Sequence, residues 1–344
     1  MKAKKRTSLY FRFINNIKIP GLIYTALVTL TTAIYNMELA ERYSHTSITV
    51  RFNISNAFGF LISTVFIASA LIVFYAFSFL RNKRATDFYM SLPIKRTEMY
   101  FTVLAAAFTW VGIAIVLSVV VGTVACLPII NLLYVNVIEI FLDFGFVVVV
   151  ALLGGGISAL SCSMTGTAGT TVLSFISLTY LPAIFPRSVL REATNIVRGN
   201  DFNNSIYSWL VDHYLVDFYF SASLGSPFSL IFTLLIAILF IALGCIFFNK
   251  RHSEIAGNGI PNKLFHLLNR GSIVLMIMWM MVDFADLFDF PTLQIIAITY
   301  VLYMAYELVI TKRLKNVIPA TLYFIPTMMA GFLPRLFGYL LTIL

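Results

Sequence analysis

The sequence predicts an all-α protein that crosses a membrane several times. Hydrophobic residues make up 60% of its 344 residues and charged residues 11%, whereas soluble domains contain roughly 45–50% apolar and about 25% charged residues. The apolar residues gather in runs long enough to cross a bilayer, which takes about 20 helical residues. A soluble fold of this length could not cover so much apolar surface with so few charges. We therefore expect the chain to lie in lipid.

Nine apolar runs are candidate membrane spans. They cover residues 20–37, 58–80, 101–124, 139–160, 168–186, 226–248, 268–288, 291–310 and 316–335. The first six spans predict a core domain over residues 1–250. Residues 251–344 are expected to form a cytoplasmic connector and two or three further membrane helices, because acidic residues weaken the seventh run and Arg335 interrupts the ninth.

The basic residues predict the orientation of these spans. With the N-terminus in the cytoplasm, the cytoplasmic segments carry 18 Lys and Arg residues and the external segments carry 5. Cytoplasmic loops of membrane proteins carry this excess, so we expect a multi-pass plasma-membrane protein with a cytoplasmic N-terminus. The same distribution accounts for the net charge of +9 without a nucleic-acid partner, since no basic and aromatic domain is present to bind one.

Two segments beside the spans are predicted to lie at the membrane surface. Residues 8–19 form an amphipathic elbow helix before the first span, with Leu9, Tyr10, Phe13, Ile14 and Ile17 on its apolar face. Pro20-Gly21 favours a break after this helix over the alternative that it extends the first span. The aromatic-rich residues 187–225 predict outer re-entrant or interfacial helices, with a plain aromatic belt as an equal alternative.

The stretch "RNKRATDFYMSLPIKRTEMY", residues 81–100, predicts a short cytoplasmic helix over residues 82–93. Its apolar face at helical spacing comprises Ala85, Phe88, Tyr89 and Leu92. Pro93 ends the helix, because proline lacks a backbone donor and restricts the residue before it. This face requires a partner, and a groove on another protein fits it best. The membrane surface and a solvated basic loop are the alternatives.

The stretch "DFYMSLPIKRTEMY", residues 87–100, resembles the cytoplasmic signature of type-2 ABC-transporter permeases, the membrane subunits of ATP-binding-cassette transporters. Two further stretches, "NKRHSEIAGNG" and "YELVITKRLK" with Glu307, are similar to elements of the Gram-positive multidrug or cell-envelope exporter subgroup and occur in the expected order. The resemblance implies a six-span permease core in a bacterial plasma membrane, with the elbow helix and the additional C-terminal spans.

The resemblance also implies roles for particular residues. The coupling helix that docks on an ATPase subunit, with its exit, would comprise Arg84, Asp87, Phe88, Tyr89, Ser91, Leu92, Pro93 and Arg96. A second cytoplasmic element would comprise Arg251, Glu254 and Gly257. The partners implied are one or two ABC ATPase subunits, the lipid bilayer and a second permease chain, identical or related.

The chain lacks the G-x-x-x-x-G-K-[ST] motif that holds ATP phosphates. We therefore expect it to be no enzyme by itself and to hold no cofactor, with ATP and Mg bound by the partner ATPase. Hydrolysis there would drive an amphiphilic drug, peptide or lipid-like compound outward. Two alternatives stay open: an ion-driven secondary transporter or channel, and a sensor or scaffold coupled to an ATPase without transport.

Other groups of residues receive more ordinary interpretations. Gly154, Gly155 and Gly156 predict tight helix packing and are a candidate flexible hinge. Glu139 and Asp143 stand at i, i+4 spacing, but they fall in the first turns of a predicted span, where carboxylates favour the helix dipole. The acidic residues near 283–289 are interpreted as interfacial, with a cation site as the alternative. Neither the histidines nor the three cysteines have metal-ligand spacing, so no metal site and no catalytic residue is predicted.

Overall fold

A computed structural model of the chain describes residues 2–44, 52–53, 55–127, 133–134, 137–179, 227–252, 256, 266–267, 269–271, 273–275, 277, 292–311 and 321–328. Apart from two strands of two residues each, the elements with assigned bounds in this part of the chain are helices. The predictions for residues 187–225, Glu254, Gly257 and the acidic group at 283–289 fall outside the described residues.

The chain divides into two compact units. Unit 1 comprises Met1–Ser163 and Phe218–Ser253, and unit 2 comprises Met164–Asp217 and Glu254–Leu344. The division therefore places residues 164–217 with the C-terminal part of the chain.

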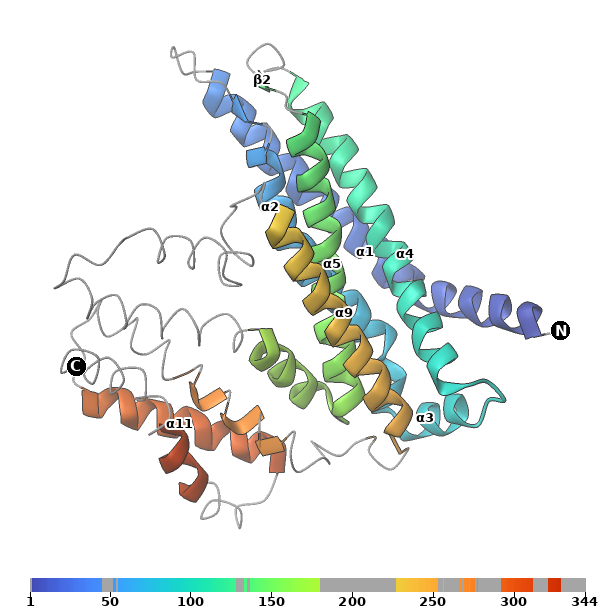
Figure 1. The fold of residues 1–344 in the computed structure, drawn as a ribbon, viewed down its shortest axis with the longest axis vertical. Coiled ribbons are helices and arrows are strands. Elements are labelled where there is room, and N and C mark those ends of the chain that lie inside the picture. The colour runs from blue at the N-terminus through green and yellow to red at the C-terminus, as the bar shows by residue number, and fades with distance from the viewer. Residues whose placement is uncertain are drawn as a thin grey trace. The chain divides into compact units, whose positions relative to one another are not determined.

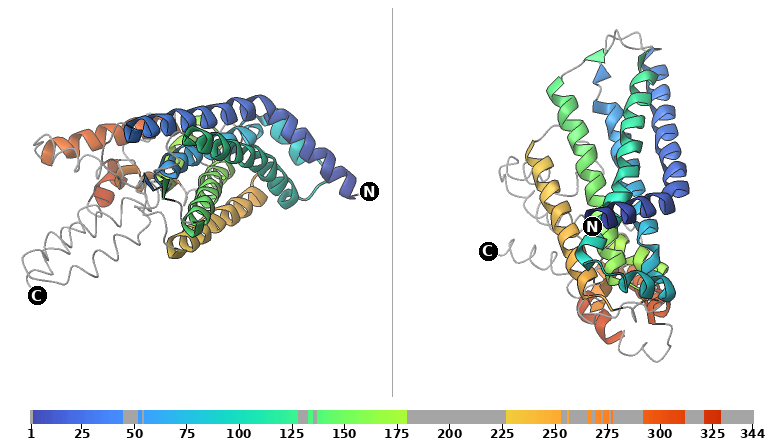
Figure 2. Two further views of the ribbon diagram at one scale, coloured as in Figure 1. Left: turned by 90° about the horizontal axis from the view of Figure 1, so that it is seen from above. Right: turned by 90° about the vertical axis from the view of Figure 1, so that its right-hand side faces the viewer.

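Unit 1 is a bundle of long helices that run side by side (Figures 1 and 2). They are α1 (Lys2–Ser44), α2 (Ser55–Ala76), α4 (Arg96–Ala125), α5 (Val137–Met164) and α9 (Pro227–Lys250). The short helices η1 (Ser78–Arg81) and α3 (Lys83–Met90) lie at one end of the bundle.

Four helices of the described residues are long and apolar enough to cross a membrane. They cover Leu9–Arg42, Arg96–Ala125, Ile140–Met164 and Leu230–Lys250. The described apolar part of α2, Phe60–Ala76, is shorter. The chain is thus a helical, membrane-embedded protein, as its composition predicts, and four of the nine predicted spans correspond to helices of full spanning length.

The predicted break after the elbow helix is wrong. α1 continues through Pro20 as one helix, and it bends there, so that its N-terminal arm, residues 2–19, turns away from the bundle (Figure 2). Proline removes one backbone hydrogen bond and crowds the preceding turn, which kinks a helix without ending it when tertiary packing holds both sides. Gly21 provides that packing: a Cβ there would lie 2.4 Å from Cδ2 of Trp110 in α4.

Two loops predicted on the external side meet in a small parallel pairing. Strand β1 (Phe52–Asn53) follows α1, and strand β2 (Leu133–Tyr134) follows α4. Phe52 pairs with Leu133, and Asn53 pairs with Tyr134. The two loops therefore lie at the same end of unit 1, as the alternation of spans requires.

α5 packs closely against its neighbours through three consecutive glycines, Gly154 to Gly156. A Cβ on the first would lie 2.5 Å from the backbone oxygen of Phe66 in α2, and one on the second 2.7 Å from the Phe108 ring in α4. A Cβ on the third would lie 3.1 Å from Cγ1 of Ile241 in α9. Small residues let helix backbones approach, so each glycine accommodates a neighbouring helix. α5 is continuous through this point.

Unit 2 has a small core of its own around α11 (Thr292–Thr311). The buried members of this core are Ile273, Val274, Tyr303, Tyr306, Phe324 and Met328. They come from the helical residues near 273, from α11 and from the helix over residues 321–328. The helix Ala168–Thr179 also belongs to this unit, and its Leu173 packs against the same core.

Candidate functional site

α3 begins at a well-formed N-terminal cap. The side chain of Asn82 accepts a hydrogen bond of 3.0 Å from the backbone N–H of Arg84, and the Thr86 N–H donates to the Asn82 carbonyl at 2.9 Å. Asparagine is among the best N-cap residues, because its side chain satisfies a donor that the first turn leaves free. α3 ends at Met90, shortly before Pro93. The helix predicted over residues 82–93 is present, one turn shorter at its C-terminal end.

The inner side of α3 is held by its own chain. The Tyr89 ring lies 5.3 Å from the Phe13 ring of α1 and 4.7 Å from the Phe79 ring of η1, measured between centroids. The Thr86 side chain is fully buried, and its hydroxyl donates to the Phe79 carbonyl at 2.8 Å. These contacts fix both the position of α3 and its rotation about its own axis.

The outer side of α3 carries a different set of residues from the predicted face. Its exposed side chains at helical spacing are Arg84, Asp87, Phe88 and Ser91. Phe88 is 47% exposed, while its neighbour Tyr89 packs inward. The predicted face of Ala85, Phe88, Tyr89 and Leu92 is therefore divided, because adjacent residues of a helix point about 100° apart. The Tyr89 ring packs on the aromatic rings of α1 and η1, whereas the exposed Phe88 ring is approached from α1 by the Arg12 guanidinium.

Two arginines of the predicted sites come together at the segments that flank α3. Arg96, at the start of α4, donates through Nη1 to the carbonyls of Asn249 at 2.9 Å and of Arg251 at 2.8 Å. Both carbonyls lie at the C-terminal end of α9, where helices leave their acceptors without intrahelical partners. Arg96 thus joins the first turn of α4, directly after the α3 exit, to the end of α9.

Arg251 extends this connection to two more helix ends. It is 1% exposed, and its Nη1 donates to the carbonyls of Cys162 at 2.8 Å and Ser163 at 3.0 Å, at the end of α5. Its Nη2 donates to the Leu80 carbonyl at 2.8 Å, in η1. A cation at helix C-termini is favourable because the free carbonyls carry partial negative charge.

The charge of Arg251 survives its burial. Burial lowers the pKa of this guanidinium to about 10, so the side chain stays protonated at neutral pH. Arg96 and Arg251, here called the arginine pair, therefore connect the ends of η1, α5 and α9 with the beginning of α4. Since η1 and α4 flank α3 in the chain, the short helix is attached to most of unit 1.

The remaining residues of the predicted docking segment form its exit turn. The Ser91 hydroxyl donates to the Phe88 carbonyl at 2.8 Å, and the Leu92 N–H donates to the Tyr89 carbonyl at 3.3 Å. Leu92 is half-buried and Pro93 is exposed. The turn leads into α4 at Arg96, whose N-cap residue Lys95 makes no side-chain capping bond.

Sequence reasoning missed three residues that hold α3. Phe13 was assigned to a lipid-facing helix face, yet that face packs on protein: Leu9, Phe13 and Ile17 are buried, and the Tyr10 hydroxyl lies 2.7 Å from that of Thr109 in α4. Phe79 and Thr86 carried no motif. The one usable signal was the 3.6-residue periodicity of the N-terminal arm, which correctly separated its buried side from Arg12, Asn15 and Asn16.

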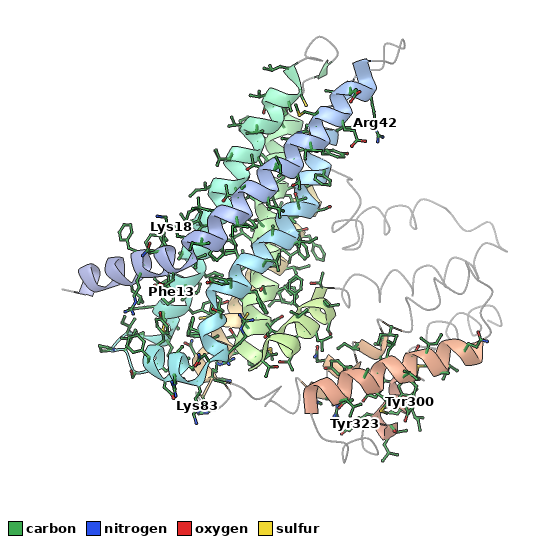
Figure 3. The ribbon with its side chains drawn as sticks, turned by 180° about the vertical axis from the view of Figure 1, so that it is seen from behind. Phe13, Lys18, Arg42, Lys83, Tyr300 and Tyr323 are labelled. Atoms are coloured by element: carbon green, nitrogen blue, oxygen red, sulfur yellow. The ribbon has the colours of Figure 1, made fainter. Side chains whose placement is uncertain are left out.

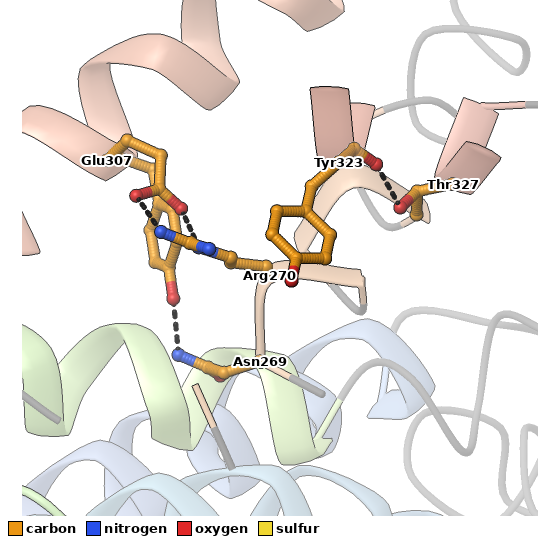
Figure 4. Close-up of polar contacts among 6 residues, drawn as sticks. Asn269, Arg270, Glu307, Tyr323 and Thr327 are labelled. Atoms are coloured by element: carbon orange, nitrogen blue, oxygen red, sulfur yellow. Dashed lines mark hydrogen bonds and ion pairs between the residues drawn. The ribbon is translucent and has the colours of Figure 1, made fainter. Parts of the chain in front are cut away.

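Unit 2 contains a buried ion pair (Figure 4). Arg270 donates through Nε and Nη2 to the two carboxylate oxygens of Glu307 in α11, and the carboxylate side chain is 4% exposed. Beside the pair, Asn269 Nδ2 donates to the Tyr306 hydroxyl at 2.6 Å. Such two-point pairing is strong and directional. Glu307, singled out by sequence, thus connects α11 to the segment around residue 270.

Among the described residues, no group of three or more His, Cys, Asp or Glu side chains is arranged to hold a metal ion. The three cysteines are free thiols and are buried. The chain matches no protein-family model, and no curated protein or solved structure matches it.

Proposed function

We propose that this chain is the membrane-spanning permease subunit of an ATP-binding-cassette exporter. It would lie in a bacterial plasma membrane with a cytoplasmic N-terminus and act with a second permease chain. A separate ATPase would bind ATP and Mg and drive an amphiphilic compound outward. The excess of Lys and Arg in the predicted cytoplasmic segments supports this orientation, and the resemblance of residues 87–100 to the permease signature supports the family.

One observation carries the proposal: α3 is held firmly on its inner side and exposed on its outer side. Tyr89 and Thr86 attach it to α1 and η1, and the arginine pair attaches both ends of its segment to α5 and α9. Arg84, Asp87 and Phe88 face outward with a charge of each sign around an aromatic ring. A force applied to this surface would move the bundle ends together, as a coupling helix requires.

The proposal is tested with Phe88→Asp. Phe88 is half exposed, so the change leaves the fold of unit 1 intact, while a carboxylate at the centre of a docked surface removes a hot-spot contact. Such a contact is worth about 2 kcal/mol or more, or at least roughly thirtyfold in affinity. We expect co-expression with the cognate ATPase to give a stable complex for the unaltered chain and none for Phe88→Asp, with ATP turnover lost in parallel.

His252→Asp is the matched control, because it places the same carboxylate at an exposed position on the same predicted side but outside α3. It should retain both the complex and its ATP turnover. If Phe88→Asp keeps complex and turnover at control levels, α3 is not the docking element and the proposal fails.

An ion-driven transporter is the second candidate, because two carboxylates are buried within apolar helices. Asp143 of α5 is 1% exposed and Glu307 of α11 is 3% exposed. Ionisable groups inside membrane segments commonly lie on ion or proton pathways. Purified chain alone, reconstituted in vesicles, would then dissipate an imposed proton gradient, and Asp143→Asn would stop it. An ABC permease subunit without its ATPase would leave the gradient intact.

A further inference from the structure

A shallow hollow lies beside the kink of α1, on the side of the N-terminal arm opposite to its buried face. Its volume is about 610 Å³, and its lining residues are Phe11, Arg12, Ile14, Asn15, Lys18 and Trp110. Figure 3 shows Lys18 and Phe13 on opposite sides of the arm. Phe13 is buried against protein, whereas Arg12 and Lys18 are exposed.

We propose that this hollow binds an anionic phospholipid of the cytoplasmic leaflet. The headgroup phosphate would lie between Arg12 and Lys18, and the upper acyl chain would lie along Phe11, Ile14 and the Trp110 ring. The leaflet assignment rests on the orientation given under the proposed function. The binding itself requires neither an ATPase nor transport.

The charges of the hollow favour an anion. Arg12 and Lys18 line it, and no Asp or Glu is found among its lining residues in the part of the chain that the structure describes. Basic residues near the surface of an anionic leaflet are attracted to its lipid headgroups. Both residues lie near the N-terminal end of the candidate membrane span Leu9–Arg42, where phospholipid headgroups would be expected.

The hydrogen-bonding groups favour a phospholipid in particular. The Trp110 indole N–H is buried and has no hydrogen-bond partner among the described residues. The polar groups that line the hollow itself are chiefly the Arg12 guanidinium and the Lys18 ammonium, which only donate hydrogen bonds. Phosphate and ester oxygens of a phospholipid only accept hydrogen bonds, so they complement these donors, and tryptophan is enriched where headgroups meet acyl chains.

The apolar surroundings suit acyl chains better than a peptide or a second copy of this chain. Phe11 is 61% exposed, and the residues that continue along α1 beyond the hollow, Ile19, Leu22 and Ile23, are each more than half exposed. This apolar strip runs from the arm into the membrane-spanning part of α1. A lipid with its headgroup at Arg12 and Lys18 would follow the same path.

Occupancy of the hollow would also reach α3. The Arg12 guanidinium lies 5.5 Å from the centroid of the Phe88 ring, a cation–π distance. A phosphate that draws Arg12 toward the hollow would weaken this contact and change the freedom of the outward ring.

Quenching of Trp110 fluorescence by brominated lipids tests the site. Trp209→Phe and Trp279→Phe leave Trp110 as the only tryptophan, since the chain has three. The chain is reconstituted without ATPase in bilayers that contain either brominated phosphatidylglycerol or brominated phosphatidylcholine at the same mole fraction. We expect the anionic lipid to compete roughly tenfold better for the position beside Trp110. Arg12→Gln with Lys18→Gln should bring that ratio close to one.

Lys83→Gln with Lys95→Gln is the matched control, because it removes two exposed basic residues on the same predicted side but outside the hollow. It should keep the preference. Equal quenching by the two lipids, a preference that survives in Arg12→Gln with Lys18→Gln, or its equal loss in the control would each overturn the proposal. Protection of Trp110 from both lipids would do the same, since it would indicate a protein occupant. None of these results depends on an ATPase, so the docking proposal stands or falls separately.

Discussion

Arg251→Met removes the connection between three helix ends while keeping an apolar side chain of similar length. The arginine donates to the carbonyls of Cys162, Ser163 and Leu80, and all three lose their donor in the variant. An unsatisfied buried polar group costs about 1–3 kcal/mol. Two effects offset part of this free-energy cost in the variant. A buried charge no longer has to be desolvated, and water reaches the carbonyls as the helix ends separate. We expect a net loss of about 3 kcal/mol in the stability of this end of unit 1.

Thiol labelling of Cys162 measures that loss directly. Cys126→Ser and Cys245→Ser leave Cys162 as the single thiol, and it is buried at the end of α5 under the Arg251 side chain. When labelling requires local opening, its rate follows the opening equilibrium. A loss of about 3 kcal/mol should therefore accelerate labelling on the order of a hundredfold. Arg251→Lys keeps the charge but offers a single ammonium, so its rate should lie between the two.

Lys250→Met is the control, because Lys250 is exposed and immediately adjacent. Surface substitutions of this kind change stability by less than about 0.5 kcal/mol, so the labelling rate should stay near that of the parent. If Arg251→Met labels no faster than Lys250→Met, the arginine does not hold these helix ends together.

Two further predictions concern packing and pH. A Cβ on Gly154 would meet backbone at 2.5 Å, whereas one on Gly112 would meet nothing within 4 Å. Gly154→Ala should therefore destabilise the protein by about 1–3 kcal/mol through strain and lower its thermal midpoint. Gly112→Ala should stabilise it by about 0.5–1 kcal/mol and raise the midpoint; a rise for both would contradict the assigned packing of α5. Burial, and then the nearby Arg270 charge, lower the pKa of His266 from 6.5, against an opposing effect of Glu307. The unfolded chain then binds a proton that the folded chain resists, so stability present above pH 6.5 is lost as the pH falls below it. His266→Gln should reduce the loss of thermal stability between pH 7.5 and pH 5.5, and an unchanged loss would exclude this histidine as its source.

Sequence periodicity predicted those features that depend on neighbours along the chain. The buried side of the N-terminal arm, the start of α3 and the long apolar helices all follow from spacing within one element. The orientation of Phe88 and Tyr89 does not, because it depends on Phe13 in another helix. Helical spacing considered for α3 alone therefore assigned the rings of Phe88 and Tyr89 to one surface.

The hydrogen-bond partners of Arg251 also could not be predicted from the local sequence pattern. They lie 89 and 171 residues away in the chain, and they are backbone carbonyls, which every residue carries. A resemblance marked Arg251 and Arg96 as residues of interest, but it placed them in separate cytoplasmic elements. The backbone carbonyls at these helix ends need hydrogen-bond donors, and the side chains of Arg96 and Arg251 supply them.

The arginine pair has a consequence for how motion at α3 would spread. A helix of eight residues attached only through its two flanking turns would swing without moving the bundle. Here the turn before α3 is joined to the end of α5 through the Leu80 carbonyl, and the turn after it is joined to the end of α9 through Arg96. α5 in turn packs closely against the α2 backbone at Gly154 and against the Phe108 ring of α4 at Gly155. Packed interfaces of this density shift as bodies rather than deform. Any force on the outer face of α3 would therefore displace α4, α5 and α9 together, whichever protein or lipid applies it.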